Sequence, residues 1–220
     1  MRLTVLIPVY NEQDSVAGLI QRVKSVPPED KEVIVVDDGS SDRTLVRIQR
    51  IAGIKVFAHE MNRGKGAAVR TGLAHATGDV VVIQDADLEY DPKDYGVLLA
   101  PFGNPKVDAV YGSRFRGNGR FLFHSRMANY FLTFLTNSLF CGRVTDMETC
   151  YKAVRRPLLQ DLGLTASRFD IEPEITARLL RQRCRIAEVP IHYNARTAGK
   201  KIGPKDGIAA CCCLLKLYLK

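Results

Sequence analysis

The sequence predicts an α/β protein with a doubly wound, mostly parallel sheet in a single domain, and two observations carry this prediction. Between residues 1 and 84, short runs of β-branched and apolar residues alternate four times with segments of helical character. Polar residues gather directly after the first, second and fourth of these runs. Because parallel strands end at one edge of a sheet, these polar segments predict a ligand crevice along that edge.

The first half of the chain contains the clearest elements. Strands are expected at residues 3–10, 32–36, 54–58 and 80–84. Residues 11–15 offer capping side chains for a helix that runs to about residue 24 and carries Val16, Leu19, Ile20 and Val23 on one face. Further helices are expected at about residues 42–51 and over an alanine-rich segment that ends near residue 78.

The second half alternates less regularly. A helix is expected from about residue 91, a strand at 109–112, a polar-then-apolar unit at 145–153, a helix at 172–181, a strand at 186–192 and a basic loop at 194–205. Residues 121–140 are rich in aromatic residues and leucine, and they predict a helix that packs on the sheet or lies partly at a membrane surface. The expected division is a main domain of residues 1–205 and a C-terminal apolar helix of residues 206–220, which is a candidate for membrane-surface association.

The length, the net charge and the longest apolar run limit the kinds of protein that this chain can be. A chain of 220 residues fits one domain, with or without an appendage. Its net charge of +8 favours an anionic partner, and nucleic acid is not expected because the basic residues are not interleaved with aromatic ones. The longest apolar run, residues 208–215, is shorter than the roughly 20 residues that span a bilayer, so we expect no membrane crossing.

Cysteine usage and the N-terminus bear on the compartment. The six cysteines form no Cys-x-x-Cys pair, and no signal peptide opens the sequence, so a reduced, cytoplasmic compartment is expected. Three adjacent cysteines, residues 211–213, are expected in the core or at an interface of the last helix, with S-acylation as the alternative. The four histidines are isolated, and we expect them to be structural.

The segment after the strand at 80–84 carries the chemistry. Asp85, Asp87 and Glu89 follow that strand within five residues. Two carboxylates at i and i+2 repel each other unless a cation lies between them, so the pattern indicates a metal site, with a solvated acidic loop as the alternative. A second acidic cluster after the strand at 32–36 offers further carboxylates or only helix caps. With scattered Arg and Lys residues, the combination suits a metal-bridged diphosphate.

Three other phosphate or metal motifs are excluded. Gly64 and Gly66 lack the third glycine of the dinucleotide fingerprint and do not follow the first strand. No Gly-Lys-Ser or Gly-Lys-Thr occurs there, as a Walker A loop would require. The acidic segment at residues 37–42 lacks the alternating ligands of a calcium loop.

Several short motifs occur in order along nearly the whole chain. They are Ile7-Pro-Val-Tyr-Asn-Glu12, Val36-Asp-Asp-Gly-Ser-Ser-Asp42, Asn62-Arg-Gly-Lys-Gly66, Asp85-Ala-Asp-Leu-Glu89, Gly112-Ser-Arg114, Thr145-Asp146 before Tyr151-Lys-Ala153, Phe169-Asp-Ile-Glu172 and Val189-Pro-Ile-His-Tyr-Asn-Ala-Arg196. Together they resemble family 2 glycosyltransferases of the GT-A (Rossmann-like) fold, and most closely the dolichyl- or polyprenyl-phosphate mannose and glucose synthases.

The resemblance implies an inverting, metal-dependent hexosyltransferase whose catalytic domain is residues 1–205. It places the nucleotide-sugar donor, GDP-mannose or a UDP-hexose, on Pro8, Tyr10, Glu12, Asp38, Lys65, Asp85, Ala86, Asp87 and Arg114. It assigns Mg²⁺ or Mn²⁺ to Asp85, Asp87 and Glu89, the last of which is often Gln in the synthases. It assigns the acceptor phosphate to Arg126, Arg196, Lys200 and Lys201, and catalysis to Asp87, Asp146 and Arg126.

A physical argument favours dolichyl or polyprenyl phosphate as the acceptor. A phosphate monoester, with a second pKa of about 6, is mostly ionised at neutral pH and needs positioning by cations more than it needs a base. The basic loop and the net charge of +8 suit this acceptor. A saccharide hydroxyl would instead need a carboxylate base, for which Asp146, Asp170 and Glu172 are candidates.

Two further classes remain as alternatives, and the acceptor implies a location. An Asp-x-Asp phosphatase normally carries its motif after the first strand, with Thr or Val where Glu89 stands here. A non-catalytic lipid-binding module would not need Asp85, Asp87 and Arg114 together. A lipid-phosphate acceptor implies a cytoplasmic protein that is peripheral at the cytoplasmic face of a membrane.

Overall fold

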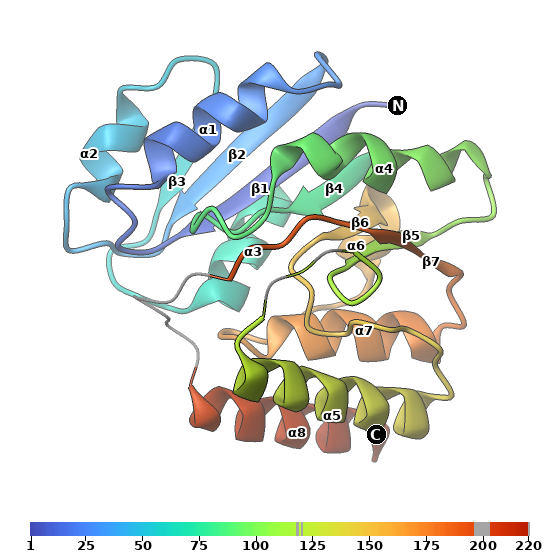
Figure 1. The fold of residues 1–220 in the computed structure, drawn as a ribbon. Coiled ribbons are helices and arrows are strands. Elements are labelled where there is room, and N and C mark those ends of the chain that lie inside the picture. The colour runs from blue at the N-terminus through green and yellow to red at the C-terminus, as the bar shows by residue number, and fades with distance from the viewer. Residues whose placement is uncertain (118, 120, 196–202, 220) are drawn as a thin grey trace.

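The computed structural model describes residues 1–117, 119, 121–195 and 203–219. Within these residues, one seven-stranded sheet runs in the order β3-β2-β1-β4-β6-β5-β7 (Figure 1). The strands are β1 (Leu3–Val9), β2 (Lys31–Asp37), β3 (Lys55–Ala58), β4 (Val80–Ile83), β5 (Ala109–Ser113), β6 (Lys152–Arg155) and β7 (Ile186–Pro190). Only β6 is antiparallel to its neighbours, β4 and β5. The predicted class, a single α/β domain with a mostly parallel sheet, is confirmed.

Helices cover both faces of this sheet (Figure 1). On one face lie α1 (Val16–Ser25), α2 (Thr44–Gln49) and α4 (Tyr95–Leu99), the last flanked by short 3₁₀ turns at η1 (Pro92–Asp94) and η2 (Ala100–Gly103). On the other lie α3 (Lys65–Ala74), α6 (Arg156–Asp161) and α7 (Ile171–Arg181). Because both faces are covered, β1 and β4 are buried along their whole length, which explains why Val, Ile and Leu make up all of β4 and most of β1.

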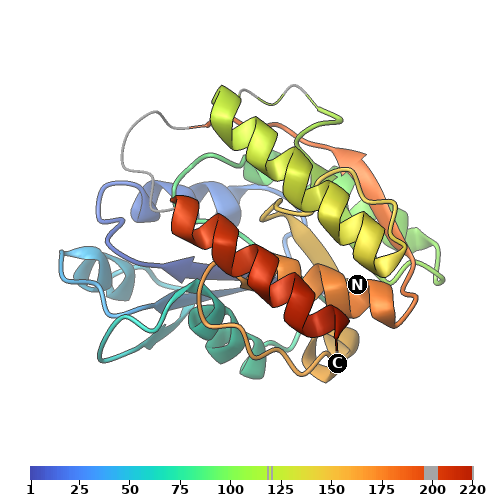
Figure 2. The ribbon, with the colours of Figure 1, turned by 90° about the horizontal axis from the view of Figure 1, so that it is seen from below.

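Two more helices form an outer layer beyond α7. α5 (Phe123–Phe140) and α8 (Pro204–Tyr218) lie side by side and pack against α7 (Figures 1 and 2). α7 therefore has protein on both sides, and it is buried along most of its length. Of the two expectations for residues 121–140, packing on the sheet is wrong, since α5 packs mainly on α7 and α8, and a partial location at a membrane surface stays a prediction. Leu214 of α8 is fully buried in the common core. The proposed boundary at residue 205 stays a prediction.

Over the described residues, no helix combines the length and the apolar character needed to cross a membrane.

The antiparallel strand β6 brings additional loops to the carboxyl edge of the sheet. The parallel strands β1, β2, β4, β5 and β7 end at this edge, whereas β6 begins there. The segment before β6, which includes Asp146, therefore meets the residues that follow β5, including Arg114. The sequence pattern at residues 145–153 does not reveal this reversal, because the strand direction depends on its partners.

Glu32 connects three strands near the start of β2. Its carboxylate accepts hydrogen bonds from Thr4 Oγ1 in β1 (2.7 Å) and from Thr77 N before β4 (2.9 Å), and it lies 2.5 Å from Nζ of Lys55 in β3. Burial alone would raise the pKa of Glu32, but the hydrogen bonds from Lys55, Thr77 and Thr4 outweigh it and lower the pKa to about 2.

Replacing Glu32 with Gln should lower the free energy of unfolding at pH 7 by about 1–2 kcal/mol, a value discounted because Lys55 is half exposed. Since the folded-state pKa lies below the unfolded value, the carboxylate contributes fully above about pH 4.5, and its contribution is lost as the pH falls toward 2. Chemical unfolding at pH 7 and at about pH 3.5 measures this. The exposed Glu60→Gln is the control, and a pH-independent difference for Glu32→Gln would contradict the assignment.

Candidate active site at the carboxyl edge of the sheet

The acidic segment after β4 lies where the strand order of the sheet reverses. β1 pairs with β2 on one side and with β4 on the other, and such a reversal is the usual ligand position in open α/β sheets. Gln84 fixes the start of this segment. Its side chain accepts hydrogen bonds from the hydroxyls of Tyr95 and Tyr151, both at 2.7 Å, and donates to the carbonyl of Asp85 at 3.0 Å. The loop is thus anchored from the core below it.

Lys65, the first residue of α3, lies between two carboxylates. Its Nζ is 2.6 Å from Oδ1 of Asp85 and 2.6 Å from Oε1 of Glu172 at the start of α7. Burial alone would lower the pKa of Lys65, but Asp85, Cys150 and Glu172 together raise it well above its ordinary value. The ammonium is therefore charged, and it joins the acidic loop to α7.

The glycines beside Lys65 serve packing rather than phosphate binding. Gly64 has a φ of 95°, and a Cβ there would lie 2.3 Å from the carbonyl oxygen of Ser167. A Cβ on Gly66 would lie 2.5 Å from the carbonyl oxygen of Ala166. The first N–H groups of α3 donate to this same segment, Gly66 N to Arg168 O and Ala67 N to Ser167 O. The helix N-terminus is thus capped by protein.

A buried ion pair joins the end of β5 to the segment before β6. Arg114 donates from its backbone N and Nε to Oδ2 of Asp146, at 2.9 and 2.8 Å, and from Nη2 to Oδ1 at 2.7 Å. The rings of Tyr193 and Phe121 lie 5.1 and 5.6 Å from the guanidinium carbon. Burial alone would lower the pKa of Arg114, but Asp146 outweighs it and raises the pKa further. Because the Tyr193 hydroxyl also donates to Glu89, this ring connects the ion pair to the acidic loop.

A third buried cation, Lys152, binds backbone carbonyl groups of the segment that follows Asp146. Its Nζ donates to the carbonyl oxygens of Met147 and Thr149 at 2.7 and 2.5 Å, and lies 4.9 Å from the centre of the Tyr111 ring. Burial lowers the pKa of Lys152. Burial, followed by the charge of Glu172, raises the pKa of the neighbouring Glu148.

The residues assigned to the nucleoside lie near the ends of β1 and β2. Pro8 is a buried residue within β1, and Tyr10 is half-buried just after it. Glu12 accepts a hydrogen bond from Ser15 Oγ at 2.6 Å. Asp38 is 3% exposed; Oδ1 contacts His59 Nδ1 and Arg63 N, and Oδ2 accepts from Gly64 N at 2.7 Å. The structure thus shows Asp38 holding the 63–64 turn, and its ribose contact stays a prediction.

The other predicted site residues of the acidic loop are Ala86, Asp87 and Glu89, and both of these carboxylates accept hydrogen bonds. Ala86 is buried, Asp87 Oδ1 accepts from Glu89 N at 3.2 Å, and Glu89 Oε2 accepts from the Tyr193 hydroxyl at 2.6 Å. In the described part of the chain, no three side chains of His, Cys, Asp or Glu form a ready-made metal cluster.

The acceptor-side residues are less well placed by the structure. Arg126 is exposed in the first turn of α5, where Nη2 donates to the Tyr130 hydroxyl at 3.3 Å. Arg196, Lys200 and Lys201 lie outside the described residues. Asp146, assigned to catalysis, has no exposed surface and binds Arg114 through both oxygens. These roles stay predictions, and for Asp146 the geometry favours an action through Arg114.

Three residues of the site were not singled out for it from the sequence. Gln84 reads as part of an apolar strand, and Tyr193 as part of a strand end. The sequence predicts Glu172 as a candidate base or as a residue that favours a helix N-terminus, and not as a partner of Lys65, from which it is far apart in the sequence. Its place in the Phe169-Asp-Ile-Glu172 motif was the one signal available.

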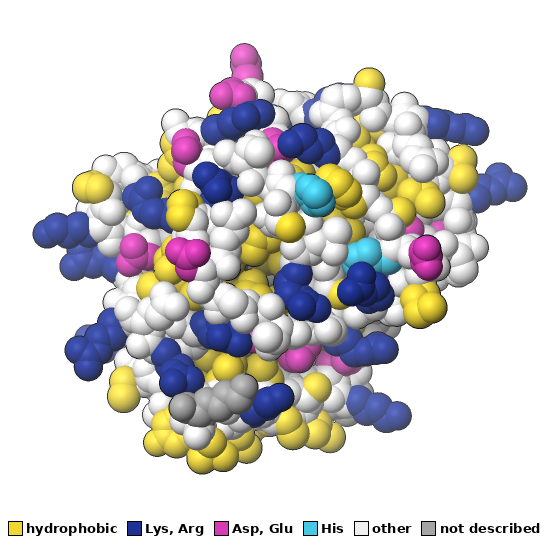
Figure 3. Space-filling view, turned by 180° about the vertical axis from the view of Figure 1, so that it is seen from behind, with side chains coloured by type: hydrophobic (Ala, Val, Ile, Leu, Met, Phe, Trp, Pro, Cys, Tyr) yellow, Lys and Arg dark blue, Asp and Glu magenta, His cyan; other side chains and the backbone are white. Residues whose placement is uncertain are grey.

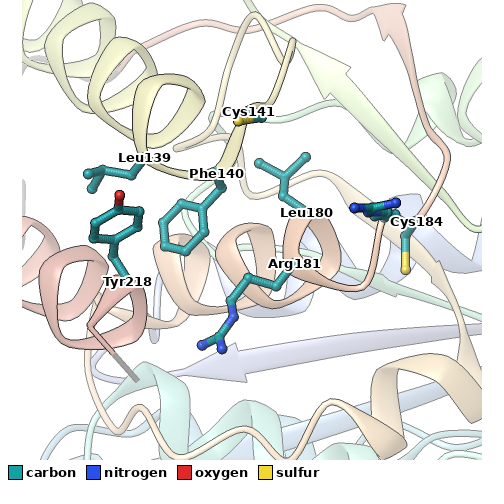
Figure 4. Close-up of a pocket in the computed structure, with 8 residues that line it drawn as sticks. Leu139, Phe140, Cys141, Leu180, Arg181, Cys184 and Tyr218 are labelled. Carbon is teal, nitrogen blue, oxygen red and sulfur yellow. The ribbon is translucent and has the colours of Figure 1, made fainter.

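Two cavities on the described surface have no lining residue in common. One of about 370 Å³ is lined by Glu89, Tyr193 and His192, beside the acidic loop. A larger one of about 570 Å³ lies between the C-terminal ends of α5, α7 and α8, where Figure 4 shows Leu139, Phe140 and Tyr218 close to Arg181. The larger cavity contains no predicted site residue, whereas the smaller one includes Glu89 of the predicted metal site.

The fold is shared with solved glycosyltransferases of the GT-A class. Glucosyl-3-phosphoglycerate synthase from Mycobacterium tuberculosis, in complex with Mn²⁺, uridine diphosphate and phosphoglyceric acid, matches with a TM-score of 0.76 over 98% of this chain and 78% of that one, at 23% identity. The same enzyme with Mg²⁺ and uridine diphosphate matches with a TM-score of 0.74 at 23% identity, over 98% of this chain and 79% of that one. At this identity the likeness concerns the fold.

Sequence comparison narrows the class to one family. The model of glycosyl transferase family 2 matches residues 4–163, so the chain belongs to that family. Dodecaprenyl-phosphate galacturonate synthase of Rhizobium johnstonii is 29% identical, over 90% of this chain and 61% of its own length. Dolichol-phosphate mannosyltransferase of Pyrococcus furiosus is 27% identical, over 91% of this chain and 58% of its own length. The chain thus spans about three fifths of these relatives. The predicted family is confirmed.

Replacing Asp146 with Ala should lower the free energy of unfolding by about 3–5 kcal/mol, because it leaves the buried guanidinium of Arg114 uncompensated. The double variant Arg114→Met, Asp146→Ala should lose less stability than the single one, since neither charge remains. Urea unfolding measures both, with the exposed Asp161→Ala as the control. If Asp146→Ala were as stable as the wild type but inactive, Asp146 would be a catalytic residue rather than a support for Arg114.

Proposed function

We propose that this chain transfers one sugar from a nucleotide-sugar to dolichyl or polyprenyl phosphate, with inversion at the anomeric carbon and with Mg²⁺ or Mn²⁺ as the cofactor. The observation that carries the proposal is the edge where β4 delivers Asp85 and Asp87 beside the buried Lys65, while the ring of Tyr193 connects Arg114 to Glu89 of the same loop. Carboxylates and cations at one crevice suit a diphosphate bridged by a metal.

The choice of acceptor is supported by the relatives. Enzymes named for dodecaprenyl phosphate, dolichol phosphate and undecaprenyl phosphate match about nine tenths of this chain at 27–29% identity. They differ in the sugar that they transfer and share a polyprenyl-type phosphate acceptor in their names. The relatives therefore support the class of acceptor, and they do not specify the sugar that is transferred.

The residues of the acidic loop fit a divalent cation that is completed by substrate. The donors are all carboxylate oxygens, which Mg²⁺ and Mn²⁺ prefer. In the described residues no complete protein cage exists, and Mg²⁺ is commonly held by one or two carboxylates together with substrate phosphates. When bound, the ion would neutralise the charge that develops on the departing diphosphate. Asp85 and Asp87 would hold it, and Tyr193 would orient Glu89.

The chain's own residues would orient the two substrates rather than exchange protons. An ionised phosphate acceptor is already a nucleophile, so the reaction needs approach and alignment. Arg114 is held by Asp146 and by the rings of Tyr193 and Phe121, and its position at the end of β5 suits a cation that steadies phosphate oxygens. Arg126, at the start of α5, would guide the acceptor phosphate.

Replacing Asp87 with Ala should reduce transfer on the order of 10²-fold or more, because one metal ligand is lost. The measurement is transfer of radiolabelled sugar from UDP-glucose, UDP-N-acetylglucosamine and GDP-mannose to a short polyprenyl phosphate with Mn²⁺, followed by organic extraction. The exposed Asp30→Ala is the control and should keep full activity. Labelling of a soluble saccharide in place of the lipid would move the protein to polysaccharide synthesis, and hydrolysis without transfer would favour a phosphatase.

We further propose that the outer layer of α5 and α8 lies against the membrane that carries the acceptor. Large apolar side chains are exposed on both helices; Phe123 is 72%, Phe134 69% and Ile208 66% exposed. The others are Met127, Tyr130, Phe131, Leu215, Tyr218 and Leu219. Figure 3 shows hydrophobic side chains gathered along this edge of the molecule, with Lys and Arg side chains above them. An apolar strip beside basic residues suits a peripheral location at the cytoplasmic face, whose lipids are anionic.

Replacing Phe131 and Phe134 together with Glu should abolish most binding to liposomes that contain anionic lipid, because two exposed rings that would enter the bilayer are exchanged for charges that it repels. Flotation measures the bound fraction. The matched control is Val46→Glu with Val97→Glu, which changes two half-exposed residues on α2 and α4, across the sheet from α5 and α8. Wild-type protein that stays unbound even at low salt would overturn the proposed membrane contact.

A further inference from the structure

Lys65, at the start of α3, contacts two carboxylates at once. Its ammonium is 2.6 Å from Asp85 and 2.6 Å from Glu172, and its side chain is only 11% exposed. One positive charge thus serves two carboxylates, one on the loop after β4 and one on α7. Asp85 is also the first of the carboxylates to which the proposed function assigns a divalent cation.

The two carboxylates differ in their access to solvent. The side chain of Asp85 is 24% exposed, whereas that of Glu172 is 6% exposed. A cation from solvent can therefore reach Asp85, while Glu172 remains covered. Lys65 can release Asp85 and keep its contact with Glu172, so the ammonium stays paired after the exchange.

We propose that Lys65 is the internal cation of the site: it neutralises Asp85 while no divalent ion is bound, and it competes with that ion for Asp85. This inference rests on the proposed function, because it takes Asp85 as a metal ligand. Lys65 is then a positioning residue that sets metal affinity, and it keeps the protein from binding the metal tightly before the nucleotide-sugar arrives. A lysine that only supports the fold would leave metal affinity unchanged or lower it.

The segment on which Lys65 lies makes this role specific. Gly64 and Gly66 let the 166–168 segment approach the start of α3 closely, and the backbone groups of that segment cap the helix. With the helix N-terminus covered, the Lys65 side chain is the cation that α3 presents to the acidic loop. The glycine-rich motif thus fixes the position of an ammonium and does not form a phosphate cradle.

The test is binding of Mn²⁺ alone, without nucleotide, to wild type and to Lys65→Met, followed by electron paramagnetic resonance of the free ion. Lys65→Met should bind Mn²⁺ at least about tenfold more tightly, since a competing charge next to Asp85 is gone. Its melting temperature should fall in EDTA and recover with Mn²⁺ by more than that of the wild type. Lys65→Arg, which keeps the charge, should bind Mn²⁺ as weakly as wild type.

The matched control is Lys55→Met, which removes another lysine–glutamate pair, with Glu32, at a site away from the acidic loop. It should leave Mn²⁺ affinity unchanged. If Lys65→Met does not fold, the double variant Lys65→Met, Glu172→Gln removes the buried unpaired carboxylate and leaves Asp85 free, and it should show the same gain in affinity.

Two outcomes separate this inference from the proposed function. If wild type binds Mn²⁺ in the presence of UDP or GDP, and Lys65→Met without nucleotide binds it no more tightly than wild type does, the role of Lys65 is overturned and the proposed function stands. If neither protein binds Mn²⁺ even with UDP or GDP present, both the metal part of the proposed function and the inference fail.

Discussion

The site depends on one constraint: charged groups that are withdrawn from water must be paired. Lys65, Arg114 and Lys152 are all buried at the carboxyl edge of the sheet, where an isolated ion would be costly. Each is satisfied by a different segment: Lys65 by the acidic loop and α7, Arg114 by Asp146, and Lys152 by two carbonyl groups that precede β6. The ion pairs of Lys65 and Arg114 join segments far apart in the sequence, so they also hold the loops of the site together, whereas the contacts of Lys152 are local.

The local pattern of the sequence predicts the strands of the first half of the chain, but it predicts neither these pairs nor the helix α6. Runs such as Val80–Ile83 predict buried strands because a strand with both faces covered has no polar side, and all four strands expected in the first half of the chain are present. The partners of Lys65 could not be predicted, because they depend on which strands are neighbours and on where α7 begins. The reversal at β6 is equally hidden, although it determines that Asp146 meets Arg114.

The same reasoning explains why the packing partner of α5 (Phe123–Phe140) could not be predicted from the sequence. An amphipathic helix reports that one of its faces is buried, and not which element buries it. Here α7 covers the sheet, so α5 packs on α7 and α8. The inner face of α5 is buried through Leu132 and Thr136, whereas Phe123, Phe131 and Phe134 face outward. Exposed aromatic surface of this extent is unfavourable in water, and a patch of this kind usually marks a binding surface.

α7 connects the two halves of the proposed function. Its first turn supplies Glu172 to Lys65, its Thr176 contacts Tyr111 of β5, and it also packs against α5 and α8. The distance between the acidic loop and the exposed apolar side chains is therefore set by a single helix that is buried along most of its length and has little freedom to shift. A reaction between a water-soluble donor and a lipid-borne phosphate requires the donor site to stand at a fixed height above the bilayer. In the proposed arrangement, a packed helix between the two surfaces would hold that height better than a loop would.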